Sequence, residues 1–83
     1  MDQVLDVRRP AEWDTGHISS ARNIPLNHLA EESQHLDRNN RIAVICAGGF
    51  RSAIASSILE QAGFQQVYNV VGGMAAWSKL PAA

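Results

Sequence analysis

The stretch that decides the fold is Ile42-Ala43-Val44-Ile45-Cys46-Ala47-Gly48-Gly49-Phe50-Arg51-Ser52, an apolar run followed by a loop with two glycines. Residues 42–45 are all apolar and mostly β-branched, which is typical of a parallel strand covered on both faces. From residue 51 to residue 62 apolar side chains recur at helical spacing, and Gly63 stands where helices commonly end. The stretch therefore predicts a strand, a short loop and a helix.

Further strands and helices alternate on either side of this unit. Strands are predicted at residues 3–7, 22–25 and 66–71, and helices at residues 11–14, 26–36 and directly after Gly72-Gly73. Strands that alternate with helices indicate right-handed crossovers and a parallel sheet. We therefore expect an α/β fold.

Length and composition narrow the class of protein. The 83 residues suffice for a single domain, 1–83, and are too few for two. With 46% apolar and 18% charged residues the chain has the profile of a folded domain. A net charge of −1 without a basic run excludes nucleic acid as an expected partner. No apolar stretch approaches the roughly 20 residues that span a bilayer and no signal pattern opens the chain, so we expect a cytoplasmic protein without membrane contact.

Cys46 is the only cysteine, so it is either a small apolar core residue or a reactive thiol. It follows the predicted central strand, and ligands of open parallel sheets bind at the carboxyl ends of the strands. Gly48 and Gly49 allow successive N–H groups to turn inward as an anion-binding nest, and the next helix adds its positive N-terminal end. Both effects lower the pKa of a thiol, and Arg51 either adds a charge or braces the loop.

The chain is similar to a known family in several stretches. Residues 46–52 resemble the active-site loop of the rhodanese family, which reads Cys, two residues, Gly, one residue, Arg, then Ser or Thr. The family's first signature is matched by residues 5–8, 12–13 and 16–25, and its closing signature by residues 63–67 and 72–77. The resemblance covers nearly the whole chain and implies a three-layer α/β/α fold around a small parallel sheet.

The resemblance also implies a function, that of a sulfurtransferase without a cofactor. Cys46 would take a sulfane sulfur from thiosulfate, glutathione persulfide or a protein persulfide and pass it to a thiol or cyanide. The substrate-binding residues would be Ala47, Gly48, Gly49, Phe50, Arg51 and Ser52, and the supporting residues Asp6, Arg8 and His17. His17 is expected to brace the chain rather than act as a base. No Cys or second His completes a metal site with His28 or His35, so no metal is assigned.

The chain departs from the family at its start, where an extra strand and helix are missing. In the family that strand lies next to the last strand of the sheet, so we expect a truncated domain, or part of a longer chain, that can associate through an exposed edge. Ser20 also stands where the family more often has Gly.

Two alternative functions remain open. One is a non-catalytic or sulfur-relay accessory module of a larger protein. The other is a Cys-dependent phosphatase or arsenate reductase, whose loops keep five residues between Cys and Arg. Cys46 and Arg51 are separated by four residues, which favours a cradle for a sulfur atom over one for a tetrahedral oxyanion.

Overall fold

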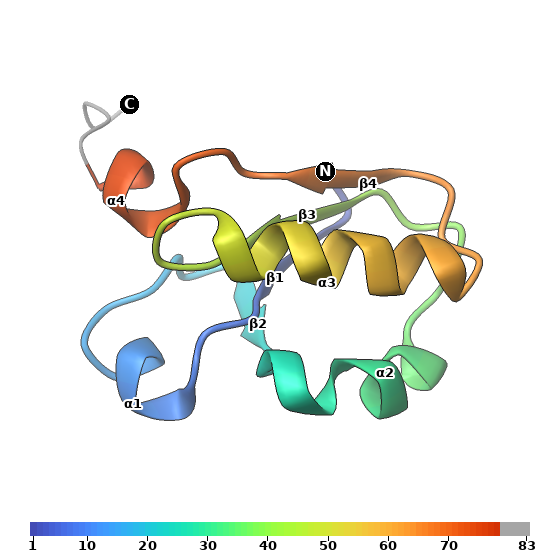
Figure 1. Ribbon diagram of the computed structural model, residues 1–83, viewed down its shortest axis with the longest axis horizontal. Coiled ribbons are helices and arrows are strands. Elements are labelled where there is room, and N and C mark those ends of the chain that lie inside the picture. Colours follow the sequence, from blue (N-terminus) through green and yellow to red (C-terminus); the bar gives the residue numbers. More distant parts are fainter. Residues whose placement is uncertain (79–83) are drawn as a thin grey trace.

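In the computed structural model, which describes residues 1–78, four parallel strands form one sheet in the order β2-β1-β3-β4 (Figure 1). The strands are β1 (Gln3–Asp6), β2 (Ala21–Asn23), β3 (Ile42–Ile45) and β4 (Val67–Asn69). β1 and β3 are the central pair, with Leu5 opposite Val44. The predicted α/β fold with a parallel sheet is therefore confirmed.

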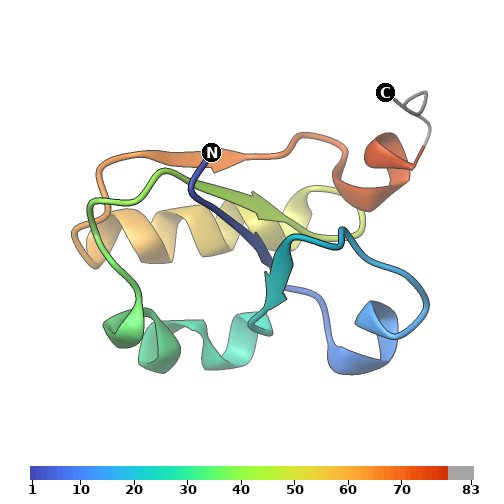
Figure 2. The same ribbon diagram turned by 180° about the vertical axis from the view of Figure 1, so that it is seen from behind.

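The helices fall into two groups. They are α1 (Pro10–Trp13), α2 (Leu29–Glu32), α3 (Phe50–Gln61) and α4 (Gly73–Trp77), with two 3₁₀ turns, η1 (Leu26–His28) and η2 (Ser33–His35), on either side of α2. α3 lies in front of the sheet in Figure 1 and behind it in Figure 2, and α2 contacts α3. α1 and α4 lie beside the carboxyl ends of the strands, where Figure 1 also shows the loop between β3 and α3.

The core lies between the sheet and α3. Leu5 and Val44 from the sheet and Leu59 from α3 are fully buried, and Phe64, which follows α3, belongs to the same buried cluster. Burying each of these side chains stabilises the fold by about 1.5–3 kcal/mol. Because β3 and α3 both pack into this core, the core fixes the positions of the end of β3 and the start of α3.

Two predicted elements differ most from the structure, whereas the strands expected at residues 3–7 and 22–25 differ from β1 and β2 by one or two residues at their ends. The single helix expected over residues 26–36 is divided into η1, α2 and η2, and Ser33 Oγ donates to the backbone oxygen of Ala30 at 2.9 Å, which favours a turn over a continuing helix. The strand expected over residues 66–71 is limited to β4, and the backbone adopts a left-handed conformation three residues later, at Gly72 (φ 81°). Within residues 1–78, β4 pairs with β3 alone, and association through its other edge stays a prediction.

None of the helices in residues 1–78 is long and apolar enough to cross a membrane.

Candidate active site

Cys46 lies directly after β3, and the loop that follows it turns back over its sulfur atom. The backbone N–H groups of Gly49 and Ser52 donate to Sγ at 3.1 and 3.3 Å, and the Ser52 hydroxyl lies 3.4 Å from Sγ. Gly49 closes the turn with φ 99°, a conformation that favours glycine, and serves as the N-cap of α3. The structure thus brings Cys46, Gly49 and Ser52 together around one sulfur atom.

The surroundings of Cys46 stabilise its anionic form. The residue is 1% exposed, and this burial raises the pKa of the thiol. Once the sulfur is ionised, hydrogen bonds that it accepts from the Ser52 hydroxyl and from the N–H groups of Ser52, Gly49 and Gly48 act in the opposite direction and outweigh burial, so the pKa of Cys46 is lowered. A lowered pKa raises the fraction of thiolate, which is the nucleophilic form.

The glycines near the loop differ in what they allow. A Cβ at Gly48 would meet nothing within 4 Å, so Gly48 contributes its N–H group rather than a special conformation. A Cβ at Gly73, where φ is +56°, would overlap the backbone of Cys46 and lie 2.7 Å from the carbonyl oxygen of Ala47. Because Gly73 has none, the N–H of Met74 reaches the carbonyl oxygen of Cys46 at 2.7 Å. The sequence marked Gly73 only as part of a signature; the structure shows that it lets α4 hold the loop.

Arg51 is paired with Glu12 and thereby ties the loop to α1. Its Nη1 and Nη2 atoms contact Glu12 Oε1 and Oε2 at 2.6 and 2.9 Å, in a paired, fork-like arrangement. The hydrogen bonds from Arg51 lower the pKa of Glu12 to about 2. The only charge in the loop is therefore neutralised, and Glu12 is a site residue that the sequence did not assign.

Asp6 and Arg8 form a buried ion pair at the end of β1. Arg8 Nη2 lies 2.8 Å from Asp6 Oδ2, and the two side chains are 7% and 0% exposed, so this is not a surface pair. Arg8 also donates to the carbonyl oxygen of Gly16 at 2.8 Å. The pair fastens the irregular segment after α1 to the centre of the sheet.

His17 and Phe50 lie at the edges of the site. The His17 ring stacks on Trp13 with centroids 3.5 Å apart, and its Nδ1 lies 2.9 Å from the carbonyl oxygen of Trp13. Both contacts are made with Trp13 of α1, and the bracing role expected of His17 stays a prediction. Phe50 is 80% exposed at the start of α3, where it is free to meet an approaching molecule.

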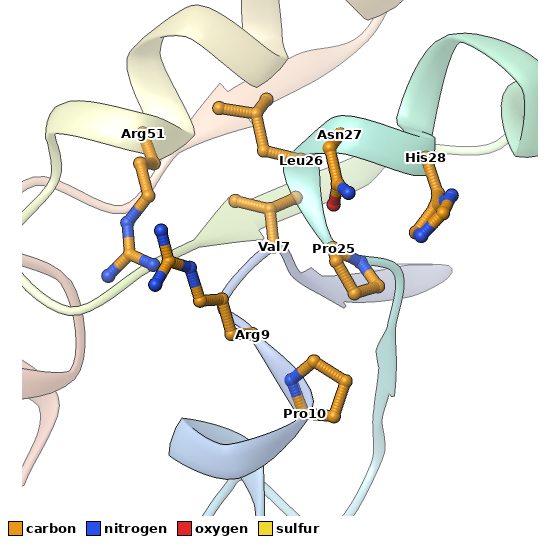
Figure 3. A pocket seen from close by; sticks show the side chains of 8 residues that line it. All are labelled: Val7, Arg9, Pro10, Pro25, Leu26, Asn27, His28 and Arg51. Carbon is orange, nitrogen blue, oxygen red and sulfur yellow. The ribbon is translucent and has the colours of Figure 1, made fainter.

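A pocket of about 560 Å³ opens beside the loop, on the side of Arg51 (Figure 3). Its lining combines apolar and cationic side chains: Val7, Arg9, Pro10, Pro25, Leu26, Asn27, His28 and Arg51. Figure 3 shows the guanidinium groups of Arg9 and Arg51 on the same side of this pocket. Cys46 does not line it, so the pocket adjoins the loop without containing the sulfur.

Within residues 1–78, no group of three His, Cys, Asp or Glu side chains is placed to hold a metal ion.

Comparison with known proteins identifies the family. Residues 1–80 match the rhodanese-like domain family, and the chain therefore belongs to it. The chain is 37% identical to thiosulfate sulfurtransferase 16 of Arabidopsis thaliana, covering 90% of this chain and 72% of that protein. It is also 37% identical to the putative sulfur carrier protein YrkF of Bacillus subtilis, of which it spans only 40% of the length. A solved rhodanese-related protein from Thermoplasma volcanium is 41% identical, with a TM-score of 0.87 over 98% of this chain and 82% of that one.

Proposed function

We propose that the protein is a sulfurtransferase in which Cys46 carries a sulfane sulfur as a persulfide. The observation that carries this proposal is the set of hydrogen bonds to Sγ from the N–H groups of Gly49 and Ser52, which stabilise a thiolate. The names of two relatives, a thiosulfate sulfurtransferase and a putative sulfur carrier protein, support the same chemistry.

The reaction has two steps, and each transfers one sulfur atom. In the first, the Cys46 thiolate attacks the outer sulfur of the donor; with thiosulfate the S–S bond of the donor breaks, sulfite leaves with the electron pair, and Cys46 becomes a persulfide anion. The N–H groups of residues 47–51 supply the fixed dipoles that stabilise the terminal sulfur. In the second, cyanide or a thiolate attacks that sulfur and releases the Cys46 thiolate, which gives ping-pong kinetics.

The charges around the loop favour a persulfide over thiosulfate as the donor. Arg51 is engaged by Glu12, so no free cation of the loop draws a small dianion to Cys46. Among residues 1–78, Arg9 has no acidic side chain as a partner, and it lines the adjoining pocket with Pro10 and Pro25. A thiol peptide that carries a carboxylate fits this combination of an unpaired cation and neighbouring apolar side chains.

The test is the intact mass of the protein after exposure to thiosulfate or to glutathione persulfide, with Cys46→Ser as the control. The expected result is a gain of one sulfur atom, faster with glutathione persulfide, that cyanide removes and the control does not show. No gain with either donor on folded protein overturns the sulfurtransferase proposal.

A second candidate is a sulfur-relay module within a longer chain, which the greater length of the putative sulfur carrier YrkF favours. Both candidates load sulfur on Cys46, so turnover distinguishes them. A sulfurtransferase forms many equivalents of thiocyanate from cyanide and donor, whereas a relay module loads once and discharges slowly to small acceptors.

A further inference from the structure

A chain of two hydrogen bonds leads from the sulfur atom to a residue that the family signatures did not single out. Cys46 Sγ donates to Ser52 Oγ at 3.4 Å, and Ser52 Oγ donates to Asn69 Oδ1 at 2.5 Å. Ser52 belongs to α3 and Asn69 to β4, so the contact joins the loop side of the site to the edge strand. Ser52 is 0% exposed, so bulk water cannot replace either partner of its hydroxyl.

In this arrangement each group donates outward, from the sulfur to Ser52 and from Ser52 to Asn69, which requires Cys46 to be a neutral thiol. A hydroxyl has one hydrogen to donate and can accept from other groups. When Cys46 has lost its proton, the sulfur only accepts, and the Ser52 hydrogen must turn from Asn69 to Sγ. Ser52 Oγ then faces Asn69 without a donor, and a buried oxygen left in this way costs free energy.

An amide satisfies both states. Asn presents an acceptor oxygen and a donor NH₂ group, which exchange places when the amide rotates about its terminal bond. With the oxygen toward Ser52 the chain runs from the thiol outward; with the nitrogen toward Ser52 it runs from Asn69 to the thiolate. A carboxylate supports the first direction only, because it cannot donate.

We propose that Asn69 is a positioning residue that orients the Ser52 hydroxyl toward the Cys46 thiolate by reversing its amide. The inference deepens the proposed function and rests on it, since the thiolate is the nucleophile of the first step and the leaving group of the second. Asn69 touches neither the sulfur nor a substrate in this scheme and acts through Ser52.

The charged groups around the sulfur are already paired with one another. The effect of Asn69 on the Cys46 thiolate can therefore be measured separately from theirs. Asp6 and Arg8 at the end of β1 bind one another, as do Glu12 of α1 and Arg51 of α3. The side of β4 that meets Ser52 contributes the neutral amide of Asn69, and α4 has no titratable side chain.

The experiment follows the thiolate absorbance of Cys46 against pH in Asn69→Asp, Ser52→Ala and the double variant, with Cys46→Ser as the blank. This signal comes from the single cysteine and needs no sulfur donor. Asn69→Asp should move the midpoint to higher pH, because its carboxylate holds the Ser52 hydrogen, and should slow sulfur loading near neutral pH by about tenfold. In the Ser52→Ala background the same change should shift the midpoint much less, since only its charge remains.

Two further variants complete the test. Asn39→Asp adds the same charge in an exposed turn and should leave the midpoint unchanged. Asn69→Leu lacks both donor and acceptor and should give a smaller upward shift, which replaces the main readout if Asn69→Asp does not fold. An equal shift with and without the Ser52 hydroxyl, or no shift in either Asn69 variant, overturns the proposal. A shifted titration without any sulfur loading would overturn the proposed function instead.

Discussion

The two ion pairs near the loop have similar geometry and opposite surroundings. Asp6 and Arg8 approach to 2.8 Å with side chains 0% and 7% exposed, whereas Glu12 and Arg51 approach to 2.6 Å with side chains 34% and 31% exposed. Both arginines present a fork of donors to a carboxylate. The two pairs differ in whether water can reach one side chain after its partner has been removed.

That difference separates the parts that the two pairs play. A buried pair whose partner is removed leaves a charge without solvent, which is costly. A half-exposed pair whose partner is removed regains water, so its loss costs little stability. The Asp6 pair should therefore be required for folding, whereas the Glu12 pair should tie the Cys46 loop to α1 with little effect on stability.

The largest effect is expected from Arg8→Met. Asp6 would remain buried without a cation, and the segment around Gly16 would lose its anchor, so the free energy of unfolding should fall by about 3–5 kcal/mol. Urea unfolding followed by circular dichroism measures this loss. The double change Asp6→Leu with Arg8→Met removes both charges and should recover part of it. A loss below about 1 kcal/mol for the single variant would show that the two pairs do not differ.

A smaller effect is expected from Arg51→Met, which removes the brace and leaves Glu12 in contact with water. The free energy of unfolding should change by less than about 1 kcal/mol. Sulfur loading should nevertheless slow, because the first turn of α3 is no longer tied to α1. A double-mutant cycle with Glu12→Gln, repeated at low and high salt, measures the coupling. The coupling energy should decrease as the salt concentration rises. A coupling of several kcal/mol that does not depend on salt would show that the Glu12–Arg51 pair is not a weak, solvent-exposed pair.

The smallest effect is expected from the titration of Glu12. Its pKa is about 2 in the folded protein against an ordinary value of 4.5, so the carboxylate form stabilises the fold above pH 4.5 and this contribution is lost as the pH falls toward 2. Because the side chain is 34% exposed, the contribution should stay below about 1 kcal/mol. Unfolding of the protein and of Glu12→Gln should therefore converge as the pH falls through this window. Parallel curves would show that Arg51 does not hold the carboxylate.

The sequence predicted most accurately the elements that depend on residues close to one another in the chain. The strand ending at Ile45, the loop and the helix after it were placed to within a residue, since apolar periodicity and glycine act locally. The segment over residues 26–36 was predicted as one helix, although Ser33 and the flanking turns divide it. Local competition between side chain and backbone is a weaker signal than periodicity.

The contacts that complete the site join distant parts of the chain, and local patterns do not encode them. Glu12 and Arg51 are 39 residues apart, and Ser52 and Asn69 are 17 apart. Glu12 was recognised as part of a signature without its partner, and Asn69 was not recognised at all. Only the packing of α1 and β4 against the start of α3 brings these pairs together.

By itself the sequence determined that a thiol follows a buried parallel strand and enters a glycine-containing loop, because strand, loop and helix each rest on residues close in the chain. The tertiary structure decided that Arg51 is neutralised, that Asp6 and Arg8 are buried, and that Gly73 lets α4 meet the backbone of Cys46. These facts depend on burial and on distances across the sheet. Both are properties of packed elements, and the order of residues within any one element does not specify them.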